Sequence, residues 1–405
     1  MKFKLFSIYA LNKSFKPVFI IGMVVLLSLS SWNTNAPGDD MYQQLAATLR
    51  KDVLTEAAWA LQQKPITVTA EVCPRSAGGR HDFYSEGDYW WPDEKNPQGP
   101  YIQKDGMTNP ENFVAHRHAM IRFSRIIGAL ASAYKITHDE RYVRAALKHV
   151  RAWFTDAGTM MNPDLQYAQA IKGVATGRGI GIIDTIQLME VVQGLEAMAH
   201  SKTLDAKTQA GVKDWFEKYI TWLTTHPYGK DEMNAKNNHG TCWTMQTACF
   251  AKFTGNVQVM KFCADRYKTV LLPSQMADDG SFPLELKRTK PYGYSIFNLD
   301  AMTTLCQILS TPQDDLFEYT TADGHNIKKG IAFLAPYLAD KSKWPYPHDV
   351  MHWESWPVAQ PALVFGAMAY HQQDWLNLWK KLDHSPQDEE VIRNLPVRHP
   401  LIWFN

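Results

Sequence analysis

The sequence predicts an all-α protein, a toroid or incomplete barrel of helical hairpins with long loops lining a cleft. Two observations lead to this prediction. Apolar side chains recur at helical spacing through most of the chain after residue 40. Short turns such as Thr137-His138-Asp139 and Thr254-Gly255-Asn256 separate neighbouring helical segments. Helix pairs joined in this way and stacked repeatedly are typical of α/α toroids, and no strand-like alternation of any length is evident.

The helices follow one another with short connections. The first carries Met41, Leu45, Leu49 and Val53 on one face. The same spacing predicts helices over residues 41–62, 111–135, 139–154, 182–200, 205–224, 239–253, 256–271, 294–310, 326–338, 357–371 and 373–382. No low-complexity linker divides the chain, so residues 37–405 are interpreted as a single domain.

Residues 1–36 resemble an export signal. Four lysines and no acid stand in this segment, and an apolar run at 18–27 is followed by small and polar residues up to a possible cleavage point after Ala36. The apolar run is too short for a comfortable membrane span. We expect a secreted or periplasmic protein with no stable membrane association once the signal is removed, and an uncleaved anchor is the alternative.

Composition and charge narrow the classes of partner. The 405 residues are 45% hydrophobic and 12% aromatic, which is ample for a large core. The formal net charge is +1, and loss of the four lysines of the leader would make it −3. No global basic field for nucleic acid is therefore expected, and a polyanion would need a local basic groove. The 14 Trp and 17 Tyr suit sugar stacking or a large helical core equally well.

The cysteines give no sign of a metal centre. An odd number, five, is present, and none belongs to a CxxC motif or a Cys/His cluster. Cys242 and Cys249 are seven residues apart on one predicted helix, about 10 Å along its axis and too far for a disulfide. All five are expected to be core residues, and no metal or other cofactor is predicted.

Three long loops interrupt the helices, at about 70–110, 156–180 and 340–356. Long loops in a compact helical domain are commonly functional. Their aromatic, basic and amide side chains, together with an arginine on the second predicted helix, are candidates for contacts with an acidic sugar: Tyr89, Trp90, Trp91, Arg117, Tyr167, Gln169, Arg178 and His352.

Two segments hold the residues that suit catalysis. The first is Asn237-Asn238-His239-Gly240-Thr241, and the second contains Arg288 and Tyr294, six residues apart across Pro291 and Gly293. Amide and guanidinium groups can neutralise a carboxylate, whereas imidazole and phenol can move protons. Each residue also has a purely structural interpretation: His239 as a helix cap, Arg288 in a salt bridge to Glu285, and Tyr294 as an interface aromatic.

These groups suit β-elimination on a uronic acid polymer. The C5 proton is weakly acidic because it is α to a carboxylate, and neutralising that carboxylate stabilises the enolate-like intermediate. A base removes this proton and an acid protonates the leaving O4. Hydrolysis would instead need two carboxyl groups facing one bond. The sequence offers candidates for such a pair in Asp88, Asp93, Glu285 and Glu354.

Four blocks of the sequence resemble the alginate-lyase-like polysaccharide lyases. The blocks are 83–110, 162–185, 237–246 and 285–301, and with the helices between them they cover most of residues 80–310. The resemblance implies an α/α toroid and cleavage of a uronate polymer by β-elimination. It also implies that Asn238 and Arg288 neutralise the carboxylate, that His239 is a base or holds the substrate, and that Tyr294 protonates the leaving oxygen.

The resemblance leaves the sugar open. In β-D-mannuronate H5 and O4 lie on one face, so Tyr294 alone could act as base and then acid. In α-L-guluronate they lie on opposite faces, and His239 would be the base. Many relatives have Trp-Tyr-Asp where this chain has Cys242-Trp243-Thr244, which bears on cleft shape. Alginate, especially mannuronate-rich alginate, is the expected substrate. The alternatives are a lyase for another polyuronate such as glucuronan, a glycoside hydrolase, and a glycan-binding protein on the same fold.

Overall fold

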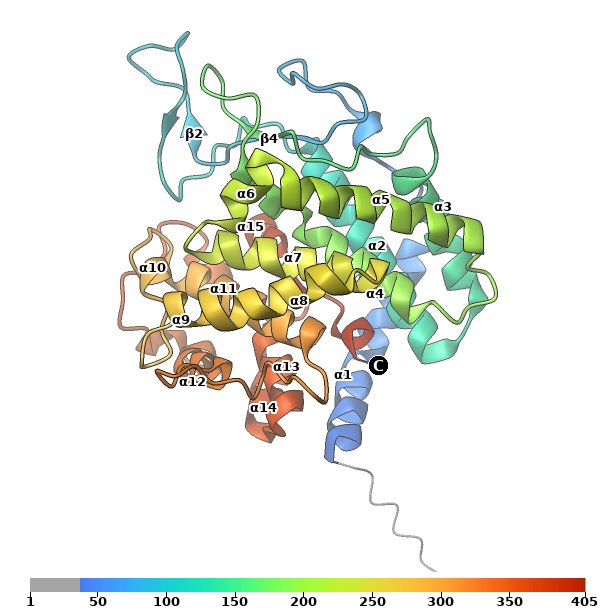
Figure 1. The fold of residues 1–405 in the computed structure, drawn as a ribbon, viewed down its shortest axis with the longest axis vertical. Coiled ribbons are helices and arrows are strands. Elements are labelled where there is room, and N and C mark those ends of the chain that lie inside the picture. Colours follow the sequence, from blue (N-terminus) through green and yellow to red (C-terminus); the bar gives the residue numbers. More distant parts are fainter. Residues whose placement is uncertain (1–36, 405) are drawn as a thin grey trace, which may run out of the picture. The chain divides into compact units, whose positions relative to one another are not determined.

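The protein was analysed as a computed structural model, which describes residues 37–404 (Figure 1). Helices dominate the described residues. The α-helices are α1 Pro37–Ala60, α2 Ala115–Thr137, α3 Glu140–Phe154, α4 Leu188–Ala197, α5 Ala206–Thr225, α6 Pro227–Met233, α7 Asn238–Thr254, α8 Val257–Arg266, α9 Leu272–Gln275, α10 Pro283–Leu286, α11 Pro291–Leu309, α12 Ile327–Ala339, α13 Pro361–Tyr370, α14 Gln373–Lys381 and α15 Glu389–Arg393.

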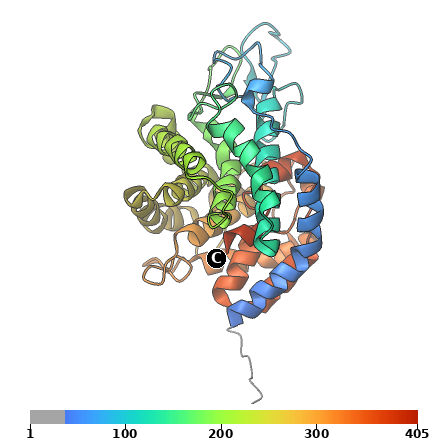
Figure 2. The same ribbon diagram turned by 90° about the vertical axis from the view of Figure 1, so that its right-hand side faces the viewer.

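Six helices form a closed ring. In chain order, α1 contacts α2, α2 contacts α4, α4 contacts α7, α7 contacts α11, α11 contacts α13, and α13 contacts α1 again. Other helices pack outside this ring, among them α3 on α2, α5 and α8 on α7, and α12 and α14 on α13. Figure 1 shows α5, α8 and α11 around α7, and in Figure 2 α1 runs beside α2. This arrangement is the predicted all-α toroid of helical hairpins.

The ring helices α7 and α11 are buried on nearly all sides because other helices cover them. Nearly every residue of α7 and α11 is buried, including Trp243, Phe250, Tyr292 and Met302. The five cysteines are all buried and unpaired, as expected for core residues. Within residues 37–404 no helix is long and apolar enough to cross a membrane.

Local sequence signals set the helix ends at the two predicted turns. His138 ends α2 with φ 55° and Gly255 ends α7 with φ 80°, both in the left-handed region that closes a helix. Asp139 then begins α3 by accepting from the N–H of Arg141, and Asn256 begins α8 by accepting from Val259. A polar cap directly after a left-handed residue gives the tight reversals from which the hairpins are built.

The structure corrects the predicted elements in three places. The segment predicted as helix 182–200 begins as a 3₁₀ helix, Gly179–Gln187, before α4. The short helices α6 and α15 were not predicted. Residues 37–404 contain four short strands, β1 Tyr84–Glu86 with β4 Tyr167–Ala170, and β2 Trp90–Trp91 with β3 Ile102–Gln103. They are too short for an alternating pattern to be visible in sequence, and they fix the first two long loops above the ring (Figure 1).

Candidate active site

A cavity of about 370 Å³ lies where the first two long loops meet the start of α7 and of α11. Eight of the twelve residues selected from the sequence line it: Tyr89, Trp90, Gln169, Arg178, Asn238, His239, Arg288 and Tyr294. The four proposed catalytic residues, which come from two separate segments of the chain, therefore face one space. The helix α6 and the C-terminal residues Arg393 and Asn394 complete the lining.

Asn238 is held by a buried carboxylate. Its backbone N–H donates to Glu285 Oε1 and its side-chain Nδ2 to Glu285 Oε2, each at 2.7 Å. Glu285 lies on α10 and faces the first turn of α7, where the helix dipole favours negative charge. Burial raises the pKa of Glu285 above its usual value. The bond to Glu285 uses one of the two amide hydrogens of Asn238, and the other remains for a ligand.

His239 is oriented by a second buried carboxylate. Its Nδ1 lies 2.6 Å from Glu232 Oε1 on α6, and the Glu232 side chain is only 4% exposed. An ionised carboxylate accepts hydrogen bonds, so this contact favours the tautomer with the proton on Nδ1. The lone pair is then on Nε2, the arrangement that a general base requires.

Arg288 is paired with an acid that the sequence did not suggest. Its Nη2 lies 2.9 Å from Asp105 Oδ1, whereas Glu285, the partner considered from the sequence, is occupied by Asn238. Thr289 also donates to Asp105, at 3.0 Å. The guanidinium lies over the ring of Tyr294, 4.5 Å from its centroid. The bonds to Asp105 use Nε and Nη2 of Arg288, so Nη1 has no hydrogen-bond partner among the described residues.

Tyr294 shares a hydrogen bond with a second phenol. The hydroxyls of Tyr294 and Tyr89 are 2.7 Å apart. Burial raises the pKa of Tyr294 above its usual value, and this effect exceeds the lowering by Arg288 and by the bond to Tyr89. Burial likewise raises the pKa of Tyr89. Because both pKa values lie above the ordinary tyrosine value of about 10, both phenols keep their protons near neutral pH.

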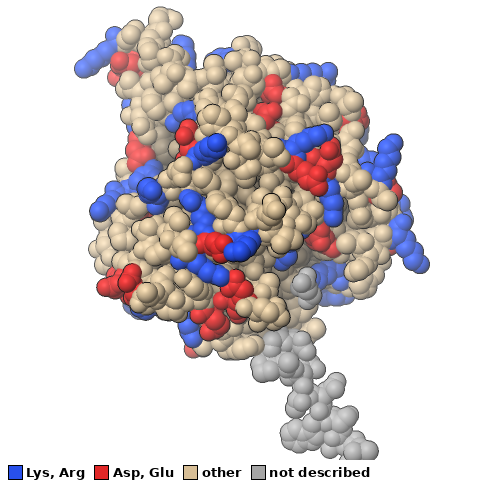
Figure 3. All heavy atoms as spheres, in the orientation of Figure 1, with Lys and Arg blue, Asp and Glu red and all other residues tan. Residues whose placement is uncertain are grey.

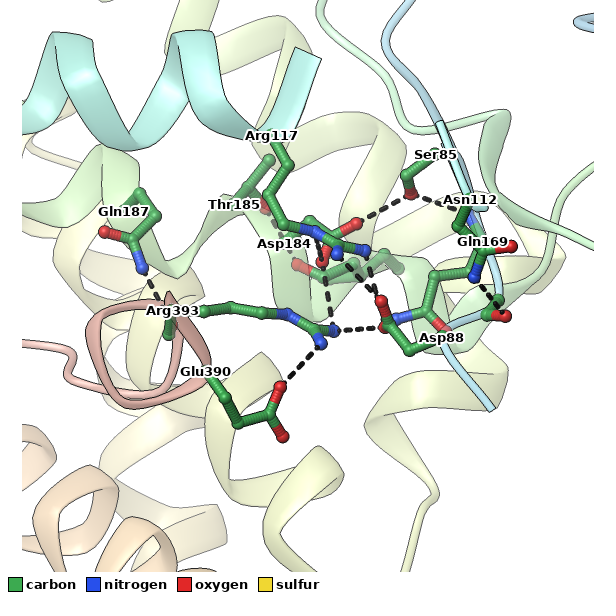
Figure 4. Close-up of polar contacts among 12 residues, drawn as sticks. Ser85, Asp88, Asn112, Arg117, Gln169, Asp184, Thr185, Gln187, Glu390 and Arg393 are labelled. Atoms are coloured by element: carbon green, nitrogen blue, oxygen red, sulfur yellow. Dashed lines mark hydrogen bonds and ion pairs between the residues drawn. The ribbon is translucent and has the colours of Figure 1, made fainter. Parts of the chain in front are cut away.

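A buried network of charged groups forms the back wall of the cavity (Figure 4). Arg117 bonds Asp88 at 2.8 Å, and Arg393 bonds Asp88 at 2.7 Å. Asp184 lies 3.4 Å from Arg117 and 3.5 Å from Arg393. Burial works against ionisation of Asp88, but the two guanidinium groups hold its pKa below the usual value. Such a network is rigid, because breaking any pair would leave an uncompensated buried charge.

Arg178, Trp90 and Gln169 form one side of the cavity. Arg178 donates to the carbonyl and side-chain oxygens of Gln169, at 2.9 and 3.2 Å, and lies 5.7 Å from the ring centroid of Trp90. Gln169 has φ 48°, a strained conformation for a residue other than glycine. No carboxylate among the described residues forms an ion pair with Arg178, so its charge is available to a ligand.

The other four residues selected from the sequence lie outside this cavity. Arg117 is buried in the charged network, and Trp91 donates from Nε1 to the carbonyl of Met107 at 2.8 Å. Tyr167 packs in a small satellite core with Phe113. His352 faces a second cavity, of about 870 Å³, and its Nδ1 lies 2.8 Å from Asp388. The third long loop does not line the first cavity. Its Asp349 instead accepts from the first N–H groups of α11.

The carboxylates considered for hydrolysis do not form a facing pair. Of Asp88, Asp93, Glu285 and Glu354, only Asp88 lines the cavity, and it is bound by two arginines. Glu285 is bound by Asn238, and Glu354 is exposed beside Lys341. A glycosidase needs one carboxyl as acid and another as base or nucleophile across one bond. These four carboxylates therefore supply no acid and base for hydrolysis at this cavity.

Several residues of the cavity were not found from the sequence. Glu232 bonds His239 and Asp105 bonds Arg288, and Arg393 pairs with Glu390 behind the cavity. Glu232 precedes His239 by seven residues, but the break between α6 and α7 hides their contact from any helical spacing rule. Lys290 was visible beside Arg288 and gave no signal by itself. On the face shown in Figure 3, basic and acidic side chains are interspersed, and no large patch of one charge stands out.

A ring of helical hairpins whose cavity holds an Asn-His pair, an arginine and a tyrosine defines an α/α-toroid polysaccharide lyase. The chain belongs to the alginate lyase family, whose model, described as "Alginate lyase", matches residues 67–344. Its structure is similar to that of an alginate lyase from Bacteroides ovatus, with a TM-score of 0.77 and 32% identity over 91% of this chain and 97% of that one.

Two further solved structures share the fold at lower identity. Alginate lyase A1-III from Sphingomonas species A1 aligns with a TM-score of 0.56 and 15% identity, over 87% of this chain and 95% of that one. A variant of alginate lyase A1-III complexed with a tetrasaccharide aligns with a TM-score of 0.57 and 15% identity, over 87% and 94%. No curated protein sequence matches the chain.

Proposed function

We propose that this lyase cleaves alginate by β-elimination in the cavity at the start of α7 and α11. The observation that carries the proposal is the meeting of Asn238, His239, Arg288 and Tyr294 in one cavity, with the Glu232 carboxylate 2.6 Å from Nδ1 of His239. Family membership and the similarity to a Bacteroides ovatus alginate lyase support alginate as the substrate.

In the proposed reaction, Asn238 and Arg288 receive the substrate carboxylate. The free amide hydrogen of Asn238 and the guanidinium of Arg288 neutralise its charge, which lowers the barrier to removing H5. Glu285 and Asp105 hold the two donors before the substrate arrives. Preorganised donors cost little reorganisation at the moment of reaction, and this is why such sites are effective.

His239 and Tyr294 divide the proton transfers. Nε2 of His239 takes H5, and the hydroxyl of Tyr294 gives its proton to O4 as the glycosidic bond breaks. The raised pKa of Tyr294 favours this acid role over a base role in the free enzyme. The division suits guluronate, whose H5 and O4 lie on opposite faces. For mannuronate, whose H5 and O4 lie on one face, Tyr294 would act as base and then as acid, and Arg288, 4.5 Å from its ring centroid, favours the ionised form that the base role needs.

The remaining cavity residues suit an acidic sugar. Trp90 offers an aromatic face for stacking, and Arg178 offers a charge for the carboxylate of a neighbouring uronate. We propose that Trp90, Gln169 and Arg178 bind the chain on one side of the scissile bond. Export is a separate part of the proposal. It is supported by the lysines and the apolar run of residues 1–36, which lie outside the described residues.

A substrate panel tests the function. Purified protein is incubated with poly-mannuronate, poly-guluronate, glucuronan and a heparin-type glycan, and the ultraviolet absorbance of the new C4–C5 double bond is followed. Absorbance is expected with the alginate blocks. Cleavage without absorbance would show hydrolysis, and binding without cleavage would show a glycan-binding protein. Turnover of glucuronan alone would replace alginate as the substrate while leaving the reaction class intact.

A further inference from the structure

We infer that a buried ion pair, Lys290 with Glu390, sets the acid strength of Tyr294 through Tyr89. The inference rests on the proposed function, in which Tyr294 is the acid. Lys290 and Glu390 are positioning residues: neither lines the 370 Å³ cavity, and each acts through the phenol of Tyr89.

The pair is brought together by two segments distant in sequence. Lys290 directly precedes α11, and its carbonyl accepts from the N–H of Tyr294 at 3.0 Å, so the two residues are one helical turn apart. Glu390 lies on α15, beyond the part of the chain that the family model matches. Lys290 Nζ and Glu390 Oε1 are 2.9 Å apart, and the two side chains are 4% and 7% exposed.

Both charges face the hydroxyl of Tyr89. Lys290 Nζ lies 3.5 Å from Tyr89 Oη and 5.1 Å from the centroid of its ring. Tyr89 Oη also lies 3.5 Å from Glu390 Oε1 and 2.7 Å from Tyr294 Oη. A continuous hydrogen-bonded chain therefore runs from Tyr294 through Tyr89 to the ion pair.

This chain bears on the acid step. When Tyr294 gives its proton to O4, a negative charge develops on its oxygen in a site from which the sugar excludes water. Tyr89 donates its hydrogen bond to that oxygen, and Lys290 balances the charge that the two phenols share. Glu390 has two effects. It holds the ammonium group of Lys290 in place, and its own negative charge destabilises a phenolate, which is opposite to the effect of Lys290. Arg393 in turn holds Glu390, 3.5 Å from its Oε2.

Other charged groups reach the two phenols from each neighbouring element. Arg288, just before α11, lies over Tyr294 and is paired with Asp105 from the first loop. Arg393 and Asp88 lie behind Tyr89. The variants that test the inference leave all four unchanged, so a difference between them reports the Lys290–Glu390 pair.

The first test is kinetic. Lys290→Met removes the positive charge at nearly constant length, and it should lower kcat about tenfold to a hundredfold while KM changes little, because one to two pKa units of acid strength are lost. Lys218→Met is the matched control. It removes a lysine charge from an exposed pair with Asp214 on α5 and should leave kcat unchanged. Equal kcat in Lys290→Met and the parent would overturn the inference.

The second test measures the phenol itself. A fluorinated tyrosine, whose phenol is more acidic, is incorporated at position 294, and its ionisation is titrated by absorbance in parent, Lys290→Met and Glu390→Gln backgrounds. Its pKa should rise in Lys290→Met and fall in Glu390→Gln, by about one unit or more each. The fluorinated residue should also restore part of the kcat lost in Lys290→Met. Shifts in the same direction, or none, would refute the inference.

The proposed function and the proposed role of the Lys290–Glu390 pair can be contradicted independently. If Lys290→Met does not fold, Glu390→Gln alone decides by the direction of its shift. Activity retained in Tyr294→Phe would remove the acid itself and with it the proposed function. An inactive Tyr294→Phe beside a fully active Lys290→Met would overturn the ion-pair role alone.

Discussion

At the scale of single residues, each proposed catalytic group is held by a partner that has a different place in the sequence. Glu232 orients His239, Glu285 holds Asn238, and Asp105 pairs with Arg288. The reactive residues could be selected from the sequence because their two segments together resemble motifs of alginate-lyase-like enzymes. Their partners are ordinary acids, and only folding shows which of the chain's 41 Asp and Glu residues they are.

The carboxylate behind His239 gives a first prediction. Glu232→Gln keeps the side-chain shape but removes the charge that stabilises imidazolium, so kcat should fall about tenfold to a hundredfold. Steady-state kinetics measure the effect. Glu217→Gln, an exposed change on α5, is the control. If Glu232→Gln had the kcat of the wild type, the Glu232 carboxylate would have no part in orienting His239 for catalysis.

The stereochemistry of the two uronates gives a second prediction. His239→Ala should reduce cleavage of poly-guluronate more than cleavage of poly-mannuronate, because only the guluronate C5 proton lies on the face opposite O4. Initial rates on the two block polymers decide the matter. An equal loss on both would show that His239 has the same part in each reaction.

At the scale of elements, the end of a helix depends on the residue that closes it, so a single substitution can test one helix end. Gly255 ends α7 with φ 80°, and a Cβ atom added at this position would have no neighbour within 4 Å, so a side chain there would meet strain but no clash. Gly255→Ala should lower the free energy of unfolding by about 1 kcal/mol, and Gly255→Asn by less. Denaturant unfolding measures both. A neutral Gly255→Ala would contradict the role of the left-handed cap.

The C-terminal segment is fastened by a buried histidine. His399 bonds Glu190 on α4 and lies 3.1 Å from Glu56 on α1, so it joins two helices of the ring. Burial alone would lower the pKa of His399, but the two carboxylates raise it to about 9. Because the folded pKa exceeds the ordinary value of about 6.5, this stabilisation is complete below that value and is lost as pH rises towards 9.

The expected loss is about 3 kcal/mol of unfolding free energy between pH 6.5 and 9, from the pKa difference of His399. His399→Gln should be less stable at pH 6.5 and should lack this decline. Chemical denaturation across the pH range measures it. A decline of the same size in His399→Gln would assign the pH dependence to another group.

At the scale of the whole molecule, helical periodicity and short turns were sufficient to predict the toroid. Eleven predicted helical segments correspond to described helices, because their apolar faces pack against the ring. Sequence patterns did not predict α6, α15 or the strands β1–β4, since each is too short to show a period. Those short elements carry Glu232, Glu390 and Arg393, three of the site residues that sequence reasoning missed.

The same scale gives a prediction about metals. Among residues 37–404 no group of three or more His, Cys, Asp or Glu side chains is placed to hold a metal ion, and the proposed reaction uses only protein groups. Chelator treatment should therefore leave the lyase rate unchanged. Activity lost in chelator and restored by calcium would contradict a metal-independent mechanism.

The central claim is that Tyr294 gives the proton that releases the leaving sugar. The most direct measurement compares Tyr294→Phe with the parent enzyme, by the absorbance of unsaturated product and by calorimetric binding of an alginate oligosaccharide. The phenyl ring keeps the packing under Arg288 but has no proton to give. The account predicts loss of cleavage on every block polymer with binding largely retained. Substantial residual cleavage by Tyr294→Phe would contradict it.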